Sequence, residues 1–151
     1  MGYTHYWHED ARPKEIPEKA VKIIKEIVDK AYKAGLIQRE YNEKKPPVVT
    51  SKEIRFNGVN DDGHETFYYG VDDKRPNIYD GELFDFCKTA RKPYDEVVMK
   101  VLIVLARYLD GFEIGSDGEF DQEWEETRDF MAKNYGIVTN PEVRLKAIKR
   151  G

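Results

Sequence analysis

The sequence predicts an α+β fold, in which about three helices cover a small antiparallel or mixed sheet and one helix is central and buried. Three observations support this prediction. The N-terminus is rich in β-branched and aromatic residues, the middle of the chain holds further strand-like segments separated by turn residues, and three segments repeat apolar residues at helical spacing. The resulting order, strand, helix, three strands and two helices, is typical of helices layered against one sheet.

The first predicted strand is the segment Gly-Tyr-Thr-His-Tyr-Trp at residues 2–7, which contains no helix start. Alternate side chains of a strand share one face. We therefore expect Tyr3, His5 and Trp7 to point to the same side of the sheet.

The first predicted helix begins near Pro17, with Glu18 in its first turn, and ends at Gly35. Its apolar residues recur at helical spacing and form one stripe: Ala20, Val21, Ile24, Ile27, Val28, Ala31 and Tyr32. This pattern predicts a helix that packs one face on a sheet.

The middle of the chain predicts a β-hairpin. After the Pro46-Pro47 break come Val-Val-Thr at 48–50 and a strand at 52–56, and a turn-rich stretch at 57–63 separates this strand from another at 64–69. A further strand is expected at 83–88, because turn residues at 76–81 precede it.

Two more helices are predicted after Pro93. Residues 94–109 are apolar except on one narrow stripe, which indicates a central, mostly buried helix. A final helix is expected from about Asp121 to Tyr135, because Gly136 stops it. The residues that this helix should bury are Phe120, Trp124, Phe130, Met131 and Tyr135. Residues 140–151 are expected to form a short basic tail, in which Asn140-Pro141 can start a short helix.

The composition predicts a single domain over residues 1–151, because no linker-like stretch divides them and 40% of the residues are hydrophobic. A net charge of -4 argues against a protein that coats duplex nucleic acid. Cys87 is the only cysteine, which excludes an intramolecular disulfide and a cysteine-based zinc site and fits a reducing cytosol. No membrane segment or signal peptide is recognisable, so we expect a cytoplasmic protein.

Charged residues make up 36% of the chain. Together with few Asn and Gln, this bias is associated with proteins from hot environments. A highly charged surface on a mesophilic protein would give the same composition, so both interpretations stand.

The best candidate site is the block Phe-Cys-Lys-Thr-Ala-Arg-Lys-Pro-Tyr-Asp at 86–95, called the basic loop below. It places Lys88, Arg91 and Lys92 beside the N-terminus of the buried helix, where the helix dipole is already positive. An external anion such as a phosphate, held also by Thr89, would compensate these charges. Alternatively, the acidic pair at 95–96 neutralises the cations, or the cations point into water. The loop lacks the glycines of a phosphate-binding loop.

The histidines are weaker candidates. His5 is either a packing residue or, together with His64 across the sheet, part of one site with Tyr94 and the basic loop. Such a site would combine imidazoles, aromatic platforms and cations suited to a nucleotide. No metal is expected at His64 and Glu65, because neighbouring residues of a strand point to opposite faces. No cofactor is predicted either.

The acidic stretch from 110 to 121 does not match a calcium-binding loop and is expected to be a solvated face. Within it, Ser-Asp-Gly-Glu at 116–119 has the form of a capping box for the last helix. Cys87 is expected to be a small buried residue.

Three segments resemble a family of small uncharacterised phage and prophage proteins. They are the opening Met-Gly-Tyr-Thr-His-Tyr-Trp, His-Glu-Thr-Phe at 64–67, and the basic loop. The resemblance spans most of the chain and implies a viral or mobile-element origin, with the host cytoplasm as location. It implies no particular activity.

Three functions follow from these observations. The first is capture of a phosphorylated small molecule or nucleotide, which would interfere with host signalling or defence. The second is an interaction protein that inhibits a host protein through its aromatic and charged surface. The third is a hydrolase of a phosphorylated ligand, with His5 or His64 as acid or base and Lys88 or Arg91 stabilising developing charge. Catalysis ranks last, because the sequence shows no triad, metal cluster or paired carboxylates. Neither the ligand nor the oligomeric state can be predicted.

Overall fold

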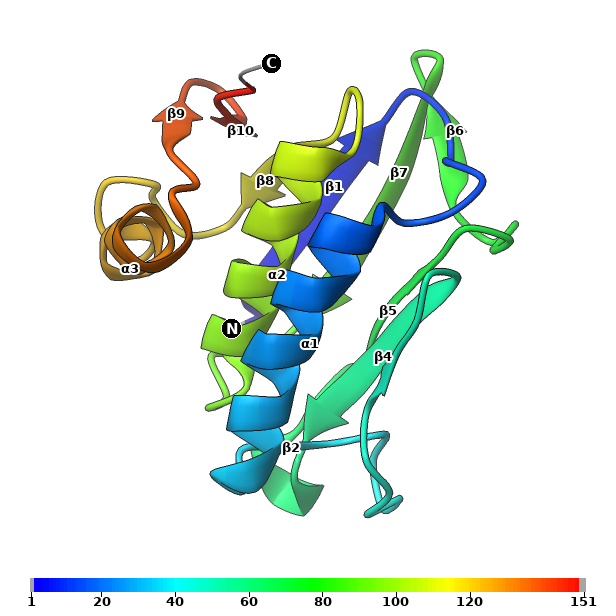
Figure 1. The fold of residues 1–151 in the computed structure, drawn as a ribbon, viewed down its shortest axis with the longest axis vertical. Helices are drawn as coiled ribbons and strands as arrows, with labels where there is room; N and C mark the ends of the chain where they lie inside the picture. The colour runs from blue at the N-terminus through cyan, green and yellow to red at the C-terminus, as the bar shows by residue number, and fades with distance from the viewer. Residues whose placement is uncertain (1, 150–151) are drawn as a thin grey trace.

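The computed structural model describes residues 2–149, which form an α+β fold of three α-helices and two antiparallel sheets (Figure 1). The larger sheet has the strand order β6-β7-β1-β8-β10-β9. Its strands are β1 (Thr4–Glu9), β6 (Asn77–Tyr79), β7 (Glu82–Lys88), β8 (Glu113–Ser116), β9 (Thr139–Pro141) and β10 (Leu145–Ala147). The smaller sheet contains β2 (Ile37–Gln38), β3 (Val48–Val49), β4 (Glu53–Gly58) and β5 (Phe67–Gly70).

Strand β1 lies in the middle of the larger sheet, between β7 and β8. His5 pairs with Cys87 on one side and with Ser116 on the other. The predicted alternation is confirmed, since Tyr3, His5 and Trp7 are all buried. Burial of Cys87 is confirmed too.

Two helices cover the buried side of the sheets, and Figure 1 shows α1 (Glu18–Lys33) and α2 (Asp95–Tyr108) side by side. Helix α2 is the central buried helix that the sequence predicts, because its buried residues lie on most of its circumference. Helix α1 buries one stripe, as predicted, although Tyr32 stays 36% exposed at its end. One cluster of buried side chains joins both sheets to these helices, so the described residues share one core.

The predicted hairpin is confirmed as β4 paired with β5. The prediction was wrong about where its second strand begins. A 3-10 turn, η1 (Asn60–Asp62), and the irregular residues 63–66 come first, and β5 begins only at Phe67. His64 therefore lies in a connection and not in a strand.

Helix α3 (Glu125–Tyr135) begins about four residues later than predicted, because residues 121–124 form turns. Trp124 and Met131 are buried as expected, whereas Phe130 is 38% exposed. Phe130 packs under the ammonium group of Lys100, which lies 4.1 Å from its ring centroid. Phe130 thus packs at the partly exposed contact between α2 and α3.

The C-terminal residues do not form the predicted tail helix. Strands β9 and β10 form a hairpin, and Leu145 pairs with Ile114 of β8. Leu145 and Ala147 are buried, and they alternate with Arg144 and Lys146, which is the period of a strand. The open edge of β8 therefore decides the conformation of this segment.

Strand β8 itself was missed, because the acidic stretch was read as a solvated face. Ile114 is fully buried, and Glu113 pairs with Lys146 on β10 and with Arg144 just before it. The expected capping box is also absent from this part of the chain. Instead, the Gly118 amide donates to Ser116 Oγ at 2.9 Å, and α3 begins well beyond it.

None of the helices in the described part of the chain is long and apolar enough to cross a membrane.

Candidate functional site

His5 is the centre of a buried polar cluster at the end of the layer between the larger sheet and α2. Its Nδ1 lies 2.8 Å from Ser116 Oγ and its Nε2 lies 2.7 Å from Asp95 Oδ1. The His5 ring has no exposed surface. The rings of Tyr3 and Trp124 pack edge-on against it, and each ring centroid lies 5.0 Å from that of His5. We call His5, Ser116, Asp95 and Thr89 the His5 centre.

Thr89, which the sequence places in the candidate anion site, belongs to this centre. It is fully buried, and its hydroxyl donates to Asp95 Oδ1, the oxygen that also contacts His5. The backbone folds back tightly here, because the Thr89 and Ala90 amides both donate to the Tyr3 carbonyl. Ala90 and Arg91 take positive φ angles of 53° and 59° to make this turn.

The cations of the basic loop diverge. Arg91 stacks on the Tyr3 ring, 3.9 Å from its centroid, and its guanidinium lies 3.7 Å from Glu123. The Lys88 ammonium lies 5.8 Å from the Phe86 ring centroid. Within residues 2–149, Lys88 and Lys92 have no carboxylate within ion-pair distance.

A shallow depression of about 320 Å³ adjoins the loop. It is lined by Tyr3, Arg91, Lys92, Pro93, Asp95, Glu96 and Glu123, so three carboxylates face two cations. This balance does not favour a phosphate. The anion site stays a prediction.

The structure does not bring His64 to His5. His64 is exposed, and its backbone is held by Asn57, whose amide nitrogen donates to the His64 carbonyl at 3.0 Å. His5, in contrast, is enclosed in the larger sheet. Tyr94 is also buried, with its hydroxyl bonded to the Glu65 carbonyl at 2.5 Å, so its ring is no open platform. The shared site of the two histidines therefore has no support.

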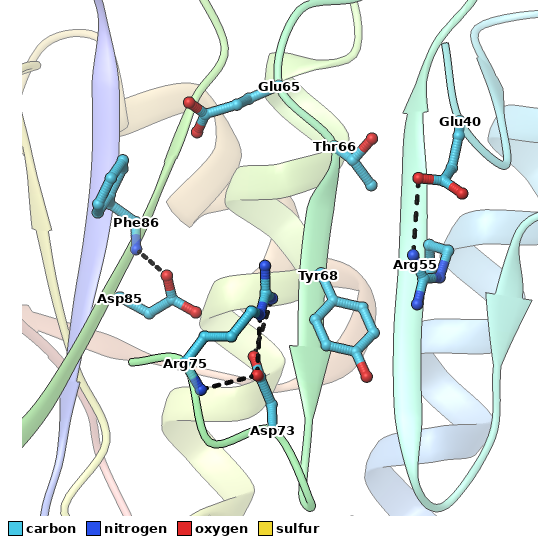
Figure 2. A pocket seen from close by; sticks show the side chains of 9 residues that line it. All are labelled: Glu40, Arg55, Glu65, Thr66, Tyr68, Asp73, Arg75, Asp85 and Phe86. Carbon is cyan, nitrogen blue, oxygen red and sulfur yellow. Dashed lines mark hydrogen bonds and ion pairs between the residues drawn. The ribbon is translucent and has the colours of Figure 1, made fainter. Parts of the chain in front are cut away.

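A cleft of about 590 Å³, which sequence reasoning missed, lies in the described part of the chain. It lies where β5 and β7 diverge. At the closed end, the Glu65 amide donates to the Lys88 carbonyl at 3.1 Å, and the Lys88 amide donates to Glu65 Oε1 at 2.9 Å. The cleft is lined by Glu40, Arg55, Glu65, Thr66, Tyr68, Asp73, Arg75, Asp85 and Phe86 (Figure 2).

Charges line the cleft in pairs. Arg75 binds Asp73 through two hydrogen bonds of 2.9 Å, and these bonds lower the pKa of Asp73. The guanidinium of Arg55 lies 3.6 Å from Glu40. Both arginines stack on the Tyr68 ring, at 4.5 Å for Arg55 and 5.2 Å for Arg75. Four carboxylates and two guanidinium groups line the cleft, which leaves an acidic excess.

Asp85 is the acidic residue on the β7 side of the cleft, and Figure 2 shows its carboxylate between β7 and the arginine side chain of residue 75. One carboxylate oxygen accepts the Phe86 amide at 2.8 Å. Burial raises the pKa of the Asp85 carboxyl above its usual value. Burial removes water from the charged form of Asp85, and a cation placed beside the carboxylate would stabilise that form.

Two strand edges border this cleft. Within residues 2–149, strand β5 pairs with no strand but β4, and the pairing of β7 with β6 ends at Phe84 opposite Asn77. Beyond that pair, the amides of Phe86 and Lys88 bind carboxylates, from Asp85 and Glu65. Side chains thus occupy donors that a neighbouring strand would otherwise use.

A second buried carboxylate lies at the other end of β1. Glu9 is 1% exposed, accepts the Tyr69 hydroxyl at 2.8 Å, and lies 3.5 Å from Arg12. Burial raises the pKa of Glu9 to about 7. The strand alternation that placed His5 inward also places Glu9 inward, so the sequence contained a signal for it.

Among residues 2–149, no group of three or more His, Cys, Asp or Glu side chains is arranged to hold a metal ion. The chain matched no protein-family model, no curated protein and no solved structure.

Proposed function

We propose that this chain is a protein-interaction module whose cleft receives an extended, basic segment of a partner protein. The observation that carries the proposal is the cleft of about 590 Å³ between two strand edges. On the β7 edge, two backbone amides are bound by the carboxylates of Asp85 and Glu65. Extended peptides commonly bind by adding to exposed strand edges.

The edges supply backbone hydrogen bonds. Asp85 and Glu65 hold the amides of Phe86 and Lys88 at 2.8 and 2.9 Å. Carbonyl groups of an incoming strand can replace these carboxylates without leaving any donor unpaired, so the exchange avoids the cost of an unsatisfied amide. Strand β5 offers its outer edge on the other side.

The charge of the cleft selects the segment. Once the incoming strand has displaced them from the backbone amides, the carboxylates of Asp85 and Glu65 remain inside the cleft. The cleft already holds more carboxylates than guanidinium groups. Arg or Lys side chains on the partner would pair with them, and Asp85 gains most because burial has raised its pKa. Alternating side chains of the segment would point into the cleft and out of it.

An uncovered aromatic surface adjoins the cleft. On the face of the larger sheet opposite His5, the ring centroids of Tyr6 and Phe84 lie 5.8 Å apart, and those of Phe84 and Phe86 lie 6.2 Å apart. Phe86 is 42% exposed and also lines the cleft. Aromatic residues are enriched at protein interfaces, so this surface extends the proposed contact. Because the resemblance to phage proteins implies a viral or mobile-element origin, we propose a host protein as the partner and its inhibition as the outcome.

Three synthetic octapeptides test the proposal by fluorescence anisotropy. They are an alternating Arg-Thr peptide, its Glu-Thr counterpart, and the Arg-Thr peptide with every second amide methylated. We expect only the unmodified Arg-Thr peptide to bind. The Glu-Thr peptide is repelled by the carboxylates of the cleft, and the methylated peptide lacks backbone N–H groups that strand pairing requires. Binding should weaken as salt screens the charges.

The Asp85→Lys variant should lose binding of the Arg-Thr peptide, whereas the matched charge reversal Asp129→Lys on the exposed face of α3 should retain it. Equal affinity of the basic and acidic peptides, or unchanged binding by Asp85→Lys, would rule out the cleft as the site.

Capture of a phosphorylated molecule or nucleotide is a second candidate. It is favoured by Lys88 and Lys92, which lie free of carboxylate partners in the described part of the chain, beside the N-terminus of α2. Phosphate and nucleotides should then raise the melting temperature of the wild type but not of a Lys88→Ala, Arg91→Ala double variant. An unshifted wild type would remove this candidate.

A further inference from the structure

We propose that Ser116 is a nucleophile that His5 and Asp95 activate for hydrolysis of a small neutral or cationic carboxylic ester. The inference rests on the His5 centre and goes beyond the proposed interaction, since it uses no residue of the cleft. A serine, an imidazole and a carboxylate in one hydrogen-bonded line can act as nucleophile, base and orienting group.

The hydrogen bonds assign the proton positions. The Asp95 carboxylate accepts the Thr89 hydroxyl and lies 2.7 Å from His5 Nε2. Because a carboxylate only accepts, Nε2 carries the imidazole proton and Nδ1 is the acceptor. Ser116 Oγ, 2.8 Å from Nδ1, therefore donates its hydroxyl proton to His5. This is the tautomer that a general base requires.

The serine oxygen is held from its other side. The Gly118 amide donates to it at 2.9 Å. Tyr3 lies so close to Gly118 that a Cβ built there would be 2.2 Å from the tyrosine hydroxyl. The Gly118 amide therefore helps to fix the serine oxygen beside His5.

Burial holds the His5 imidazole, the proposed base, in one orientation. His5 has no exposed surface and pairs directly with Ser116 across β1 and β8. The Trp124 ring contacts His5 at 5.0 Å, and its buried indole N–H finds no acceptor among residues 2–149. The Trp124 ring thus shields the imidazole from water.

The substrate class follows from access and charge. Ser116 is partly exposed, and Tyr3 and Asp95, but not Ser116 itself, line the depression of about 320 Å³ described above. That volume is at the low end for small-molecule sites. Its three carboxylates against two cations disfavour an anionic ester.

The reaction has two balanced steps. Ser116 Oγ forms a bond to the ester carbonyl carbon while its proton moves to His5 Nδ1, and the alcohol then leaves with that proton. Water next attacks the acyl-serine, again passing a proton to Nδ1. The carboxylic acid is released and Ser116 regains its hydrogen.

A fluorophosphonate probe tests the nucleophile directly, because serine attack on phosphorus expels fluoride and leaves a stable adduct. We expect one adduct per chain, mapped to Ser116 by mass spectrometry. The only other serine, Ser51, provides a matched control, so Ser51→Ala should label fully and Ser116→Ala should not label. Asp95→Asn should slow labelling at least roughly 100-fold, since it removes the orienting carboxylate.

Hydrolysis of p-nitrophenyl acetate should follow the same order among the variants, with melting curves confirming that each one folds. His5→Gln should abolish the rise of the labelling rate with pH that an imidazole base imposes. No adduct on the folded wild type, or equal labelling of the wild type and Ser116→Ala, would overturn the proposal. Peptide binding in the cleft is measured separately and is unaffected by either outcome.

Discussion

The His5 centre and the cleft use similar chemical groups under opposite conditions. In the centre, one imidazole, two hydroxyls and one carboxylate are bonded to one another behind aromatic rings. In the cleft, arginines and carboxylates form pairs at the surface, where the Arg75 side chain is 71% exposed. Burial therefore holds the first set in one arrangement, whereas solvent allows the second set to exchange partners.

This difference decides what each region can do. Groups that are fixed and shielded suit chemistry that needs a defined proton position. Exposed pairs have small net energies, so a partner can replace them at little cost.

The largest effect is expected in the apolar layer under both regions. Leu102 on α2 has no exposed surface, so Leu102→Ala should reduce the free energy of unfolding by roughly 2–5 kcal/mol. Chemical denaturation measures this loss. Val143, at 96% exposure, is the matched control, and Val143→Ala should change stability by less than about 0.5 kcal/mol. Similar effects of both substitutions would mean that α2 is not the core.

A buried carboxylate should make stability depend on pH. Because burial raises the pKa of Glu9 to about 7, ionisation is easier in the unfolded chain. The contribution of Glu9 to stability is then full below about pH 4.5, falls as pH rises toward 7, and is constant above that, a loss of up to about 3 kcal/mol. Denaturation across this range should show a flatter profile for Glu9→Gln. A profile identical to that of the wild type would contradict the burial argument.

Within the His5 centre, removing the Thr89 hydroxyl should lower the free energy of unfolding by more than the loss of one small polar group suggests. Thr89→Val leaves the Asp95 carboxylate without one of its two donors, and we expect a loss of roughly 1–3 kcal/mol in the free energy of unfolding. Thr4→Val is the control, since the Thr4 hydroxyl has no hydrogen bond among residues 2–149. Equal stability of the two variants would show that the centre is not a coupled network.

The cleft should show the smallest effect. The Glu40 and Arg55 side chains are 39% and 32% exposed, and their charged atoms are 3.6 Å apart. Glu40→Gln should therefore change the free energy of unfolding by less than about 0.5 kcal/mol. A loss above about 1.5 kcal/mol would mean that the cleft pairs are structural and cannot exchange with a ligand.

The sequence predicts the parts of this fold that depend on local periodicity. Alternation in β1 places His5 inward, and the apolar pattern of α2 identifies the buried helix. The contact between His5 and Ser116 could not be predicted from local sequence patterns, because the two residues are 111 positions apart. Ser116 also lies in a four-residue strand that contains a glycine and an acidic residue, so nothing nearby suggested a strand.

The same limit applies to the cleft. Its two borders belong to different sheets, and their divergence follows from how the sheets pack on the helices. The basic loop attracted attention because three cations are adjacent in sequence. Folding separates those cations, and it joins Asp73, Arg75 and Asp85 with Tyr68 from another strand.

Backbone amide hydrogen exchange with and without the alternating Arg-Thr octapeptide shows whether the peptide binds at the strand edges of the cleft. If the peptide adds to the strand edges, exchange should slow in β5 and at Phe86 and Lys88, while the amides of α3 stay unchanged. Binding that leaves β5 and β7 exchanging at their free rates would place the peptide elsewhere and contradict the account.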